Sequence, residues 1–307
     1  MADCVWAGPC VSAVERSILV AYGMCGLLVY LCRKLRPRTL LGLGLVTIAV
    51  ASASLTLYGA WSRYWSPAQV KVAREQLWMP SPSQAANQIS AYRGHWTAQM
   101  NVRVPDAVQM ETIFFVAFTF WRVTGLMLAG MAHFKLGVFS AKWPASLYWT
   151  MIAVALCIGI PVTLYGTHRD FATDWDFRYC FFYGAQFNYW ASLLVSFGWV
   201  GAMMLASRAA ALLPFTRRLA AVGRMAFTNY IMHTMICTTI FYGHGFGLFG
   251  KLERAGQFVI VLAVWTLQLV ISPIWLRHFL FGPLEWLWRS LTYLQWEPLR
   301  RSPAVGR

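Results

Sequence analysis

Several polar side chains stand inside an apolar segment, in the stretch GRMAFTNYIMH at residues 223–233. Asn229 and His233 are four residues apart and therefore share one face of a helix, while Arg224 and Thr228 form a neighbouring face. An imidazole takes up a proton near neutral pH, so His233 is a candidate catalytic base in a polar cavity. The alternative is that these side chains hydrogen-bond across helices and serve packing alone.

A second pair, Arg122 and His133 in FWRVTGLMLAGMAH, is separated by eleven residues, or about three helical turns, and so shares a helical face. Arg122 falls near mid-depth of its apolar run, where a charge costs about 2.5–3.5 kcal/mol on insertion scales. We therefore predict that Arg122 faces the helix bundle and joins the polar cavity, and that Arg122→Leu abolishes the activity. His133 is the second candidate base, with an ordinary interfacial position beside Lys135 as the alternative. The predicted hydrogen-bond acceptors of Arg122 are on two other helices: Asn229, His233, Gln186 and Asn188.

The composition indicates that lipid surrounds these residues. Of the 307 residues, 58% are hydrophobic and 12% are charged, and 16 are Trp. Soluble domains carry about 25% charged residues, so this chain is predicted to be a polytopic membrane protein with the lipid bilayer as its partner. The net charge of +15 lies in short clusters between apolar runs, which argues against nucleic-acid binding. Homo-oligomerisation is left open.

A helix that spans a bilayer needs about 20 apolar residues. The sequence therefore predicts an all-α fold of about seven transmembrane helices, with an amphipathic loop at 62–110 outside the cytoplasm and an interfacial C-terminal helix at 281–293. We expect a short extramembrane N-terminus at 1–16, a single membrane domain at 17–296 and a basic cytoplasmic tail at 297–307. The expected spans are 17–32, 39–61, 111–134, 145–166, 181–206, 219–242 and 256–276.

The distribution of Lys and Arg predicts how the chain crosses the membrane. If the N-terminus lies outside, the basic clusters at 33–38, 135–142 and 208–218 and those from 277 onward all lie inside. Cytoplasmic loops carry such an excess of positive charge. We therefore predict a multi-pass protein of the bacterial inner membrane with an outer N-terminus and a cytoplasmic C-terminus.

Two stretches, GRMAFTNYIMH…FYGHGFGLFG and SPIWLRHFLFGPLEWLWRSLTY, resemble the C-terminal region of the domain-of-unknown-function 418 (YeiB-like) family of bacterial inner-membrane proteins. The stretch ILVAYGMCGLLVYLCRKLRPRTLLGLGL is similar to a mid-chain helix of that family and its basic turn. The specific, family-like region is expected at about 140–296. Compared with the family, the chain is expected to lack the N-terminal helices that carry a D-x-x-R-G stretch.

The resemblance implies a distant relation to membrane proteins that transfer acyl groups, with an acyl donor such as acetyl-CoA if that relation holds. Because related acyltransferases carry their catalytic Arg and His in a first helix that is expected to be missing, such an enzyme would be incomplete. A transporter or permease that uses the polar cavity is the alternative function, and a non-catalytic envelope scaffold is another.

Other motifs predict no further chemistry. GFGLFG at 245–250 matches the dinucleotide fingerprint, but it follows an expected helix and not a strand, so we interpret it as a turn. Asp170, Asp174 and Asp176 form an acidic patch that we interpret as a solvated loop, with weak attraction of cations as the alternative. The sequence contains no metal-binding or nucleotide-binding motif. Cys4 and Cys10 are candidates for a disulfide if the N-terminus lies outside.

Overall fold

The computed structural model describes residues 18–300 of the chain. These residues are mainly helical, and the only β-type pairing among them is an isolated bridge between Phe279 and Arg300. The predicted all-α fold is therefore confirmed. The expected N-terminal segment 1–16, with Cys4 and Cys10, and the end of the basic tail lie outside the described residues.

Five helical segments in the described part of the chain are long and apolar enough to cross a membrane. Their outward surfaces carry large apolar side chains, such as Leu57, which is 70% exposed, and Trp199, which is 69% exposed. Lipid contact accounts for such surfaces, and the chain is a multi-pass membrane protein. The five segments are Pro37–Tyr64, Phe114–Lys135, Ala145–Ala172, Tyr179–Arg208 and Arg254–His278.

The predicted count of seven spans is not confirmed, because one expected segment divides into two helices and the described part of another is short. Helix α2 covers Ile18–Leu31, about 21 Å at 1.5 Å per residue, against an apolar core of about 30 Å. The segment expected at 219–242 divides into α11 (Leu213–Arg224) and α12 (Ala226–Phe241).

The break between α11 and α12 lies at Met225, whose φ of −112° and ψ of 31° are not helical. The side chain of Asn229 stabilises this break, because its Nδ2 donates to the carbonyl oxygen of Val222 at 3.1 Å. The last carbonyls of a helix lack partners four residues on, and the Val222 carbonyl accepts this bond together with the backbone N–H of Met225 at 3.1 Å. Asn229 therefore serves as a C-terminal cap for α11.

The described chain divides into two compact units. The first contains the described residues up to Ala86 together with Asn101–Arg208, and the second contains Asn87–Met100 and the described residues from Ala209 onward. The single membrane domain expected at 17–296 stays a prediction.

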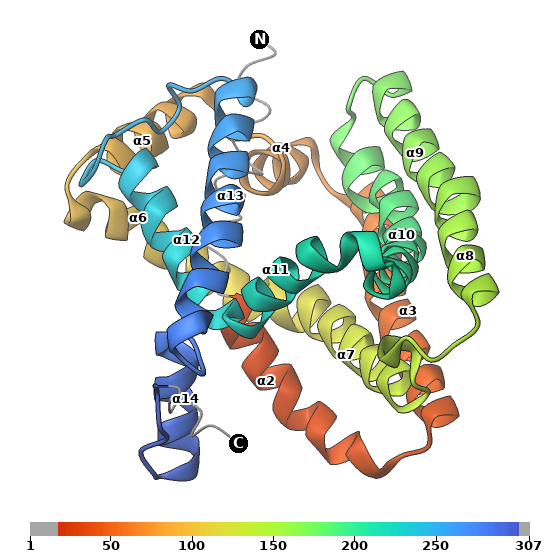
Figure 1. Ribbon diagram of the computed structural model, residues 1–307. Coiled ribbons are helices and arrows are strands. Elements are labelled where there is room, and N and C mark those ends of the chain that lie inside the picture. The colour runs from red at the N-terminus through yellow and green to blue at the C-terminus, as the bar shows by residue number, and fades with distance from the viewer. Residues whose placement is uncertain (1–17, 301–307) are drawn as a thin grey trace, which may run out of the picture. The chain divides into compact units, whose positions relative to one another are not determined.

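In the first unit, α3 (Pro37–Trp61) packs against α7 (Phe120–Lys135). The helices α8 (Ala145–Val154) and α9 (Ile160–Ala172) continue each other through a π-helical turn and run beside α10 (Ala185–Arg208), as Figure 1 shows. Because neighbouring spans are antiparallel, the C-terminal ends of α3 and α9 and the N-terminal end of the α10 span lie on one membrane face. The cleft described below lies at this end.

The crossing of α3 and α7 depends on two glycines. A Cβ atom on Gly125 would lie 2.6 Å from the side chains of Ile48 and Thr47 and 2.7 Å from the carbonyl oxygen of Gly44. Small residues let helix backbones approach closely where water provides no driving force between helices. Gly44 and Gly125 therefore set the distance between these two spans.

The second unit contains α11, α12, α13 (Arg254–His278) and α14 (Pro283–Tyr293). Within it, α11 packs against α13, and α12 packs against both α13 and α14. The helix expected at 281–293 is confirmed by α14, which begins at Pro283, since a proline at the first helical position gives up no hydrogen bond.

The loop at 62–110 contains three helices, whereas its sequence, PAQVKVAREQLW at 67–78 and QAANQISAY at 84–92, predicts two. α4 (Pro67–Leu77) begins with a capping box, in which Ser66 and Gln69 each bond the other's backbone. α5 (Pro82–Arg93) begins in the same manner after Ser81. The helix that was not predicted is α6 (Trp96–Gln109), which contains Pro105, a residue that normally argues against a helix interior.

Candidate functional site: a cleft at one end of the first unit

Arg122 hydrogen-bonds to another helix, as predicted, although its acceptors differ from the four residues named above. Its Nη1 donates to the carbonyl oxygen of Tyr189 at 3.1 Å, and its Nη2 donates to Ser192 Oγ at 2.9 Å. The guanidinium also lies over the Tyr189 ring, 3.9 Å from its centroid. These contacts join α7 to α10 inside the first unit, which is how a charge within a span is compensated.

His133 lies near the other end of α7 from the cleft. Its Nδ1 lies 2.7 Å from the carbonyl oxygen of Ala129, and its ring centroid lies 4.8 Å from that of Phe197. A histidine with a structural role typically has a ring nitrogen near the backbone carbonyl one turn earlier and packs its ring on a neighbour, here Phe197. Its role as a catalytic base stays a prediction.

The other predicted cavity residues lie in the second unit. Asn229 is 5% exposed and exchanges hydrogen bonds with Ser272 of α13. His233 Nε2 lies 3.5 Å from Cys237 Sγ, one turn further along α12. Arg224 donates to the carbonyl oxygen of Leu280 at 3.0 Å. A cavity that joins Arg122 to this group stays a prediction, as does catalysis by His233.

Thr228 has a partner that the sequence did not predict. Glu285 of α14 accepts hydrogen bonds from the Thr228 backbone N–H, at 2.9 Å, and from the Thr228 hydroxyl. The positive end of the α12 dipole favours a carboxylate at this place. The spacing of Glu285 and Arg289 suits an ion pair, but Arg289 instead lies over the Phe281 ring, 4.6 Å from its centroid.

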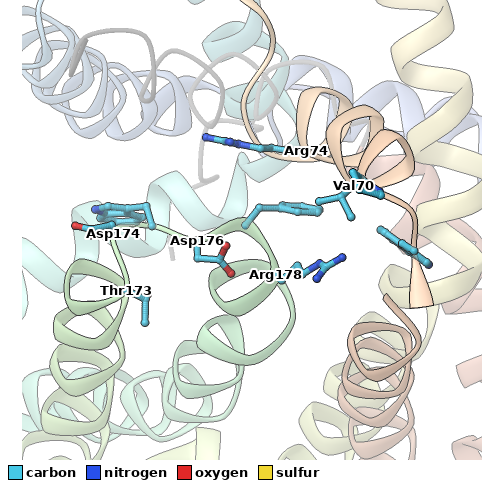
Figure 2. Close-up of a pocket in the computed structure, with 10 residues that line it drawn as sticks. Val70, Arg74, Thr173, Asp174, Asp176 and Arg178 are labelled. Atoms are coloured by element: carbon cyan, nitrogen blue, oxygen red, sulfur yellow. The ribbon is translucent and has the colours of Figure 1, made fainter. Parts of the chain in front are cut away.

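A cavity in the first unit lies where α4 begins and where the turn after α9 leads into α10 (Figure 2). It has a volume of about 610 Å³, within the usual size of small-molecule sites. We call it the larger compartment. Its walls combine aromatic, aliphatic and charged side chains: Trp65, Pro67, Val70, Arg74, Thr173, Asp174, Trp175, Asp176, Phe177 and Arg178.

A second cavity of about 220 Å³, which we call the smaller compartment, shares Asp176 and Arg178 with the first. Its remaining walls come from the end of α3 and the start of the α10 span: Gly59, Ser62, Arg63, Tyr179 and Tyr183. Because the two compartments share residues, one ligand can occupy both. We refer to them together as the cleft.

The turn that carries Asp174 and Trp175 into the cleft holds a strained backbone. Asp174 has a φ of 48° and Trp175 a φ of 56°, in the left-handed region that side chains other than glycine rarely adopt. Hydrogen bonds fix the turn, since Trp175 N donates to the carbonyl oxygen of Asp170 at 3.0 Å. Strain of this kind clusters at functional sites, which supports a role for the cleft.

Aromatic side chains form the floor of the cleft. The Trp65 ring makes edge contacts with the rings of Tyr58, Trp61 and Phe182, at centroid distances of 5.3, 5.9 and 6.3 Å. Trp61 and Trp65 are residue types that suit the membrane interface, because their side chains combine an apolar body with a polar edge. We therefore expect the cleft to lie at the level where lipid tails meet headgroups.

The amino-acid sequence alone did not reveal this cleft. Asp174 and Asp176 read as part of a solvated acidic patch, and no pattern indicated a role for Arg74 or Arg178. The sequence feature that could have indicated the cleft is the high density of charged and aromatic residues in HRDFATDWDFRY. Within residues 18–300, no group of three or more His, Cys, Asp or Glu side chains is arranged to hold a metal ion.

The GFGLFG stretch forms a turn between α12 and α13, which agrees with the sequence interpretation. Gly247 and Gly250 have φ values of 61° and 65°. The Gly243 N–H, just before the stretch, donates to the carbonyl oxygen of Tyr92, and Arg93 Nε donates to that of Phe249 at 2.8 Å. The turn thus packs on the end of α5, as a structural element of the second unit.

Arg122→Leu is expected to lower the free energy of unfolding by about 1–3 kcal/mol, because it removes two charge-assisted hydrogen bonds and the ring contact between α7 and α10. Thermal unfolding in detergent, followed by intrinsic fluorescence, measures this loss. Arg122→Lys is the matched control, because it keeps the positive charge but loses the planar guanidinium that makes both hydrogen bonds. Unfolding of the Leu variant at the wild-type temperature would contradict the structural role. The predicted loss of activity stays a separate expectation.

Comparison with known proteins places the chain in a family. It is 28% identical to the uncharacterized protein YeiB of Escherichia coli (strain K12) over 285 residues, which is 91% of this chain and 70% of that protein. It is 54% identical over 85 residues to the uncharacterized protein YxaH of Bacillus subtilis (strain 168), which is 28% of this chain and only 21% of YxaH. No solved structure matches the chain. Residues 133–295, more than half of the chain, match the family described as "Protein of unknown function (DUF418)". The chain therefore belongs to the DUF418 family.

Proposed function

We propose that this chain binds an amphiphilic molecule in the cleft, at the surface of the bacterial inner membrane, as the substrate site of a group-transfer protein. The supporting observation is the composition of the larger compartment, where Trp65, Trp175 and Phe177 meet Arg74 and Asp174 at the ends of apolar spans. Aromatic walls bind an apolar chain or ring, and the charged groups orient a polar head.

The proposed orientation puts the cleft on the outer face. With an outer N-terminus and a cytoplasmic C-terminus, the end of α3 and the turn after α9 face away from the cytoplasm. An amphiphile would then reach the cleft from the outer leaflet. Modification of a cysteine introduced at position 174 by a membrane-impermeant thiol reagent in intact spheroplasts tests this orientation, and protection there would contradict it.

In the group-transfer interpretation, the amphiphile is the acceptor and an acyl donor such as acetyl-CoA is the second substrate. Incubation of the purified protein with radiolabelled acetyl-CoA and a membrane lipid extract tests this interpretation, and a labelled lipid would support it. Release of labelled acetate alone, or no turnover, would contradict group transfer while leaving amphiphile binding intact.

Transport is the second candidate function, and polar contacts inside the spans favour it. Ser52 Oγ donates to Gln186 Oε1 at 2.6 Å and accepts from Trp190 Nε1 at 3.1 Å, within the same unit as Arg122. An ionisable residue inside a span, such as Arg122, is a default indication of a pathway, and these neutral polar groups lie in the same unit. Ligand uptake into proteoliposomes that is lost in Gln186→Leu would favour transport over group transfer.

Val70→Trp is expected to fill the larger compartment and to reduce amphiphile binding at least about fivefold, which corresponds to about 1 kcal/mol. A monoacylglycerol that carries a diazirine in its acyl chain is a suitable probe, with the labelled positions mapped by mass spectrometry. Labelling is expected at residues 65–74 and 173–178.

Val72→Trp is the matched control, because Val72 lies on the same helix, is 52% exposed and does not line the cleft. Equal labelling in both Trp variants, or labelling spread evenly over the spans, would contradict the proposed binding site.

A further inference from the structure

The smaller compartment contains hydrogen-bond donors without acceptors. Arg178 Nε and the Tyr183 hydroxyl are both buried, and neither has a hydrogen-bond partner among residues 18–300. Both residues line this compartment. Buried donors of this kind are nearly always paired, so an unpaired couple in one cavity indicates a missing acceptor.

The charges around the compartment favour an anionic acceptor. Arg63 and Arg178 contribute two positive charges, and Asp176 contributes one negative charge. Asp176 Oδ2 already accepts the backbone N–H of Tyr179 at 2.9 Å, as the cap of the helical turn that begins there. Figure 2 shows the Arg178 guanidinium directed away from Asp176, on the side of the cleft where Val70 lies.

We propose that the smaller compartment is a phosphate-binding subsite, in which Arg63, Arg178 and Tyr183 hold the phosphate group of the ligand. This inference rests on the proposed function, since it names the polar head of the molecule whose apolar part occupies the larger compartment. Guanidinium groups present paired donors that match phosphate oxygens, and a tyrosine hydroxyl adds a neutral donor.

The position of the subsite explains how one molecule fills the cleft. Asp176 and Arg178 border both compartments, so a phosphate held by Arg178 is adjacent to the aromatic walls of the larger one. Asp176 can accept a hydrogen bond from a singly protonated phosphate monoester or pair with a cationic group on a diester. The same chemistry fits a lipid headgroup and a soluble phosphate ester.

The experiment compares two photoreactive probes with identical acyl chains, the diazirine monoacylglycerol and its phosphate ester. In detergent-solubilised full-length protein, the phosphate ester is expected to label the cleft at probe concentrations at least about tenfold lower, the gain typical of charged hydrogen bonds. Arg178→Gln is expected to remove this advantage, and Tyr183→Phe to reduce it about fivefold. The readout is the ratio of labelling by the two probes within each variant, so an effect of the substitution that is common to both probes cancels.

Matched controls separate the subsite from general effects of charge and folding. Arg218→Gln removes an exposed charge from α11, and Tyr165→Phe removes a hydroxyl from an exposed ring on α9, and both should keep the phosphate advantage. Inorganic phosphate is the competitor that distinguishes the ligand's source. Competition at millimolar concentration supports a soluble phosphate ester, and its absence supports a lipid headgroup.

Two results would overturn the inference. Equal labelling by the two probes in the wild type would show that the cleft binds amphiphiles without a phosphate subsite. A phosphate advantage that survives both Arg178→Gln and Arg63→Gln would assign the phosphate to other residues. If neither probe labels the cleft, and Val70→Trp changes nothing, the proposed function itself fails.

Discussion

Gly125→Leu is expected to prevent stable packing of α3 against α7, with a loss of at least about 3 kcal/mol in the free energy of unfolding. The new side chain would begin at a Cβ atom only 2.6 Å from Ile48 and Thr47 and 2.7 Å from the Gly44 backbone. A backbone atom cannot rotate away as a flexible side chain can, so the helices must separate. Size-exclusion chromatography and thermal unfolding in detergent measure the outcome.

Gly130→Leu is a close control, because Gly130 lies on the same helix and a Cβ there would meet no atom within 4 Å. Both substitutions replace a helical glycine by the same residue, so their helix propensities match. We expect Gly130→Leu to behave as the wild type or to be slightly more stable. Similar instability in both variants would contradict the close crossing of α3 and α7.

Gly243→Ala adds only one methyl group, but we expect it to lower the free energy of unfolding by at least about 3 kcal/mol. The new Cβ would overlap the carbonyl oxygen of Arg93, where the turn after α12 lies on the end of α5. The backbone bond from Gly243 N to the carbonyl oxygen of Tyr92, 2.9 Å long, would then break. The aromatic contact of Tyr92 with Phe249, at 4.6 Å between centroids, would loosen as well.

The same turn provides a contrasting substitution at Gly247, which has a φ of 61° but open space around it. Gly247→Ala should lower the free energy of unfolding by about 1–2 kcal/mol, because a Cβ atom is disfavoured only by the left-handed backbone conformation at this position. Hydrogen exchange at residues 87–100, followed by mass spectrometry, should increase in Gly243→Ala and change little in Gly247→Ala. An equal increase in hydrogen exchange in the two variants would show that the contact between this turn and the end of α5 does not depend on the close approach of Gly243 to the Arg93 carbonyl.

The sequence predicted local structure well where a local cause exists. Long apolar runs determine membrane helices, because the backbone must satisfy its own hydrogen bonds in lipid. Pro283 identified the start of α14, because a first-turn proline gives up no bond. Helix α6 was not predicted, and its Pro105 is a local signal against a helix that the surrounding structure overrode.

The candidate site could not be predicted in this manner. Its walls come from Trp65–Arg74 and Thr173–Arg178, about a hundred residues apart in the sequence, and they meet because the spans that carry them end on one face. Glu285 illustrates the same limit. Its spacing from Arg289 suits an ion pair, yet its carboxylate caps α12 at Thr228.

The amino-acid sequence by itself determined that this chain is a helical membrane protein of the DUF418 family, because composition and apolar length are properties of the chain alone. Only the tertiary structure decided which groups meet. In lipid, helices associate through close contacts at small residues and through hydrogen bonds, and neither leaves a periodic pattern in the sequence. The partners of Arg122, the break at Met225 and the cleft with its unpaired Arg178 and Tyr183 donors all follow from these contacts.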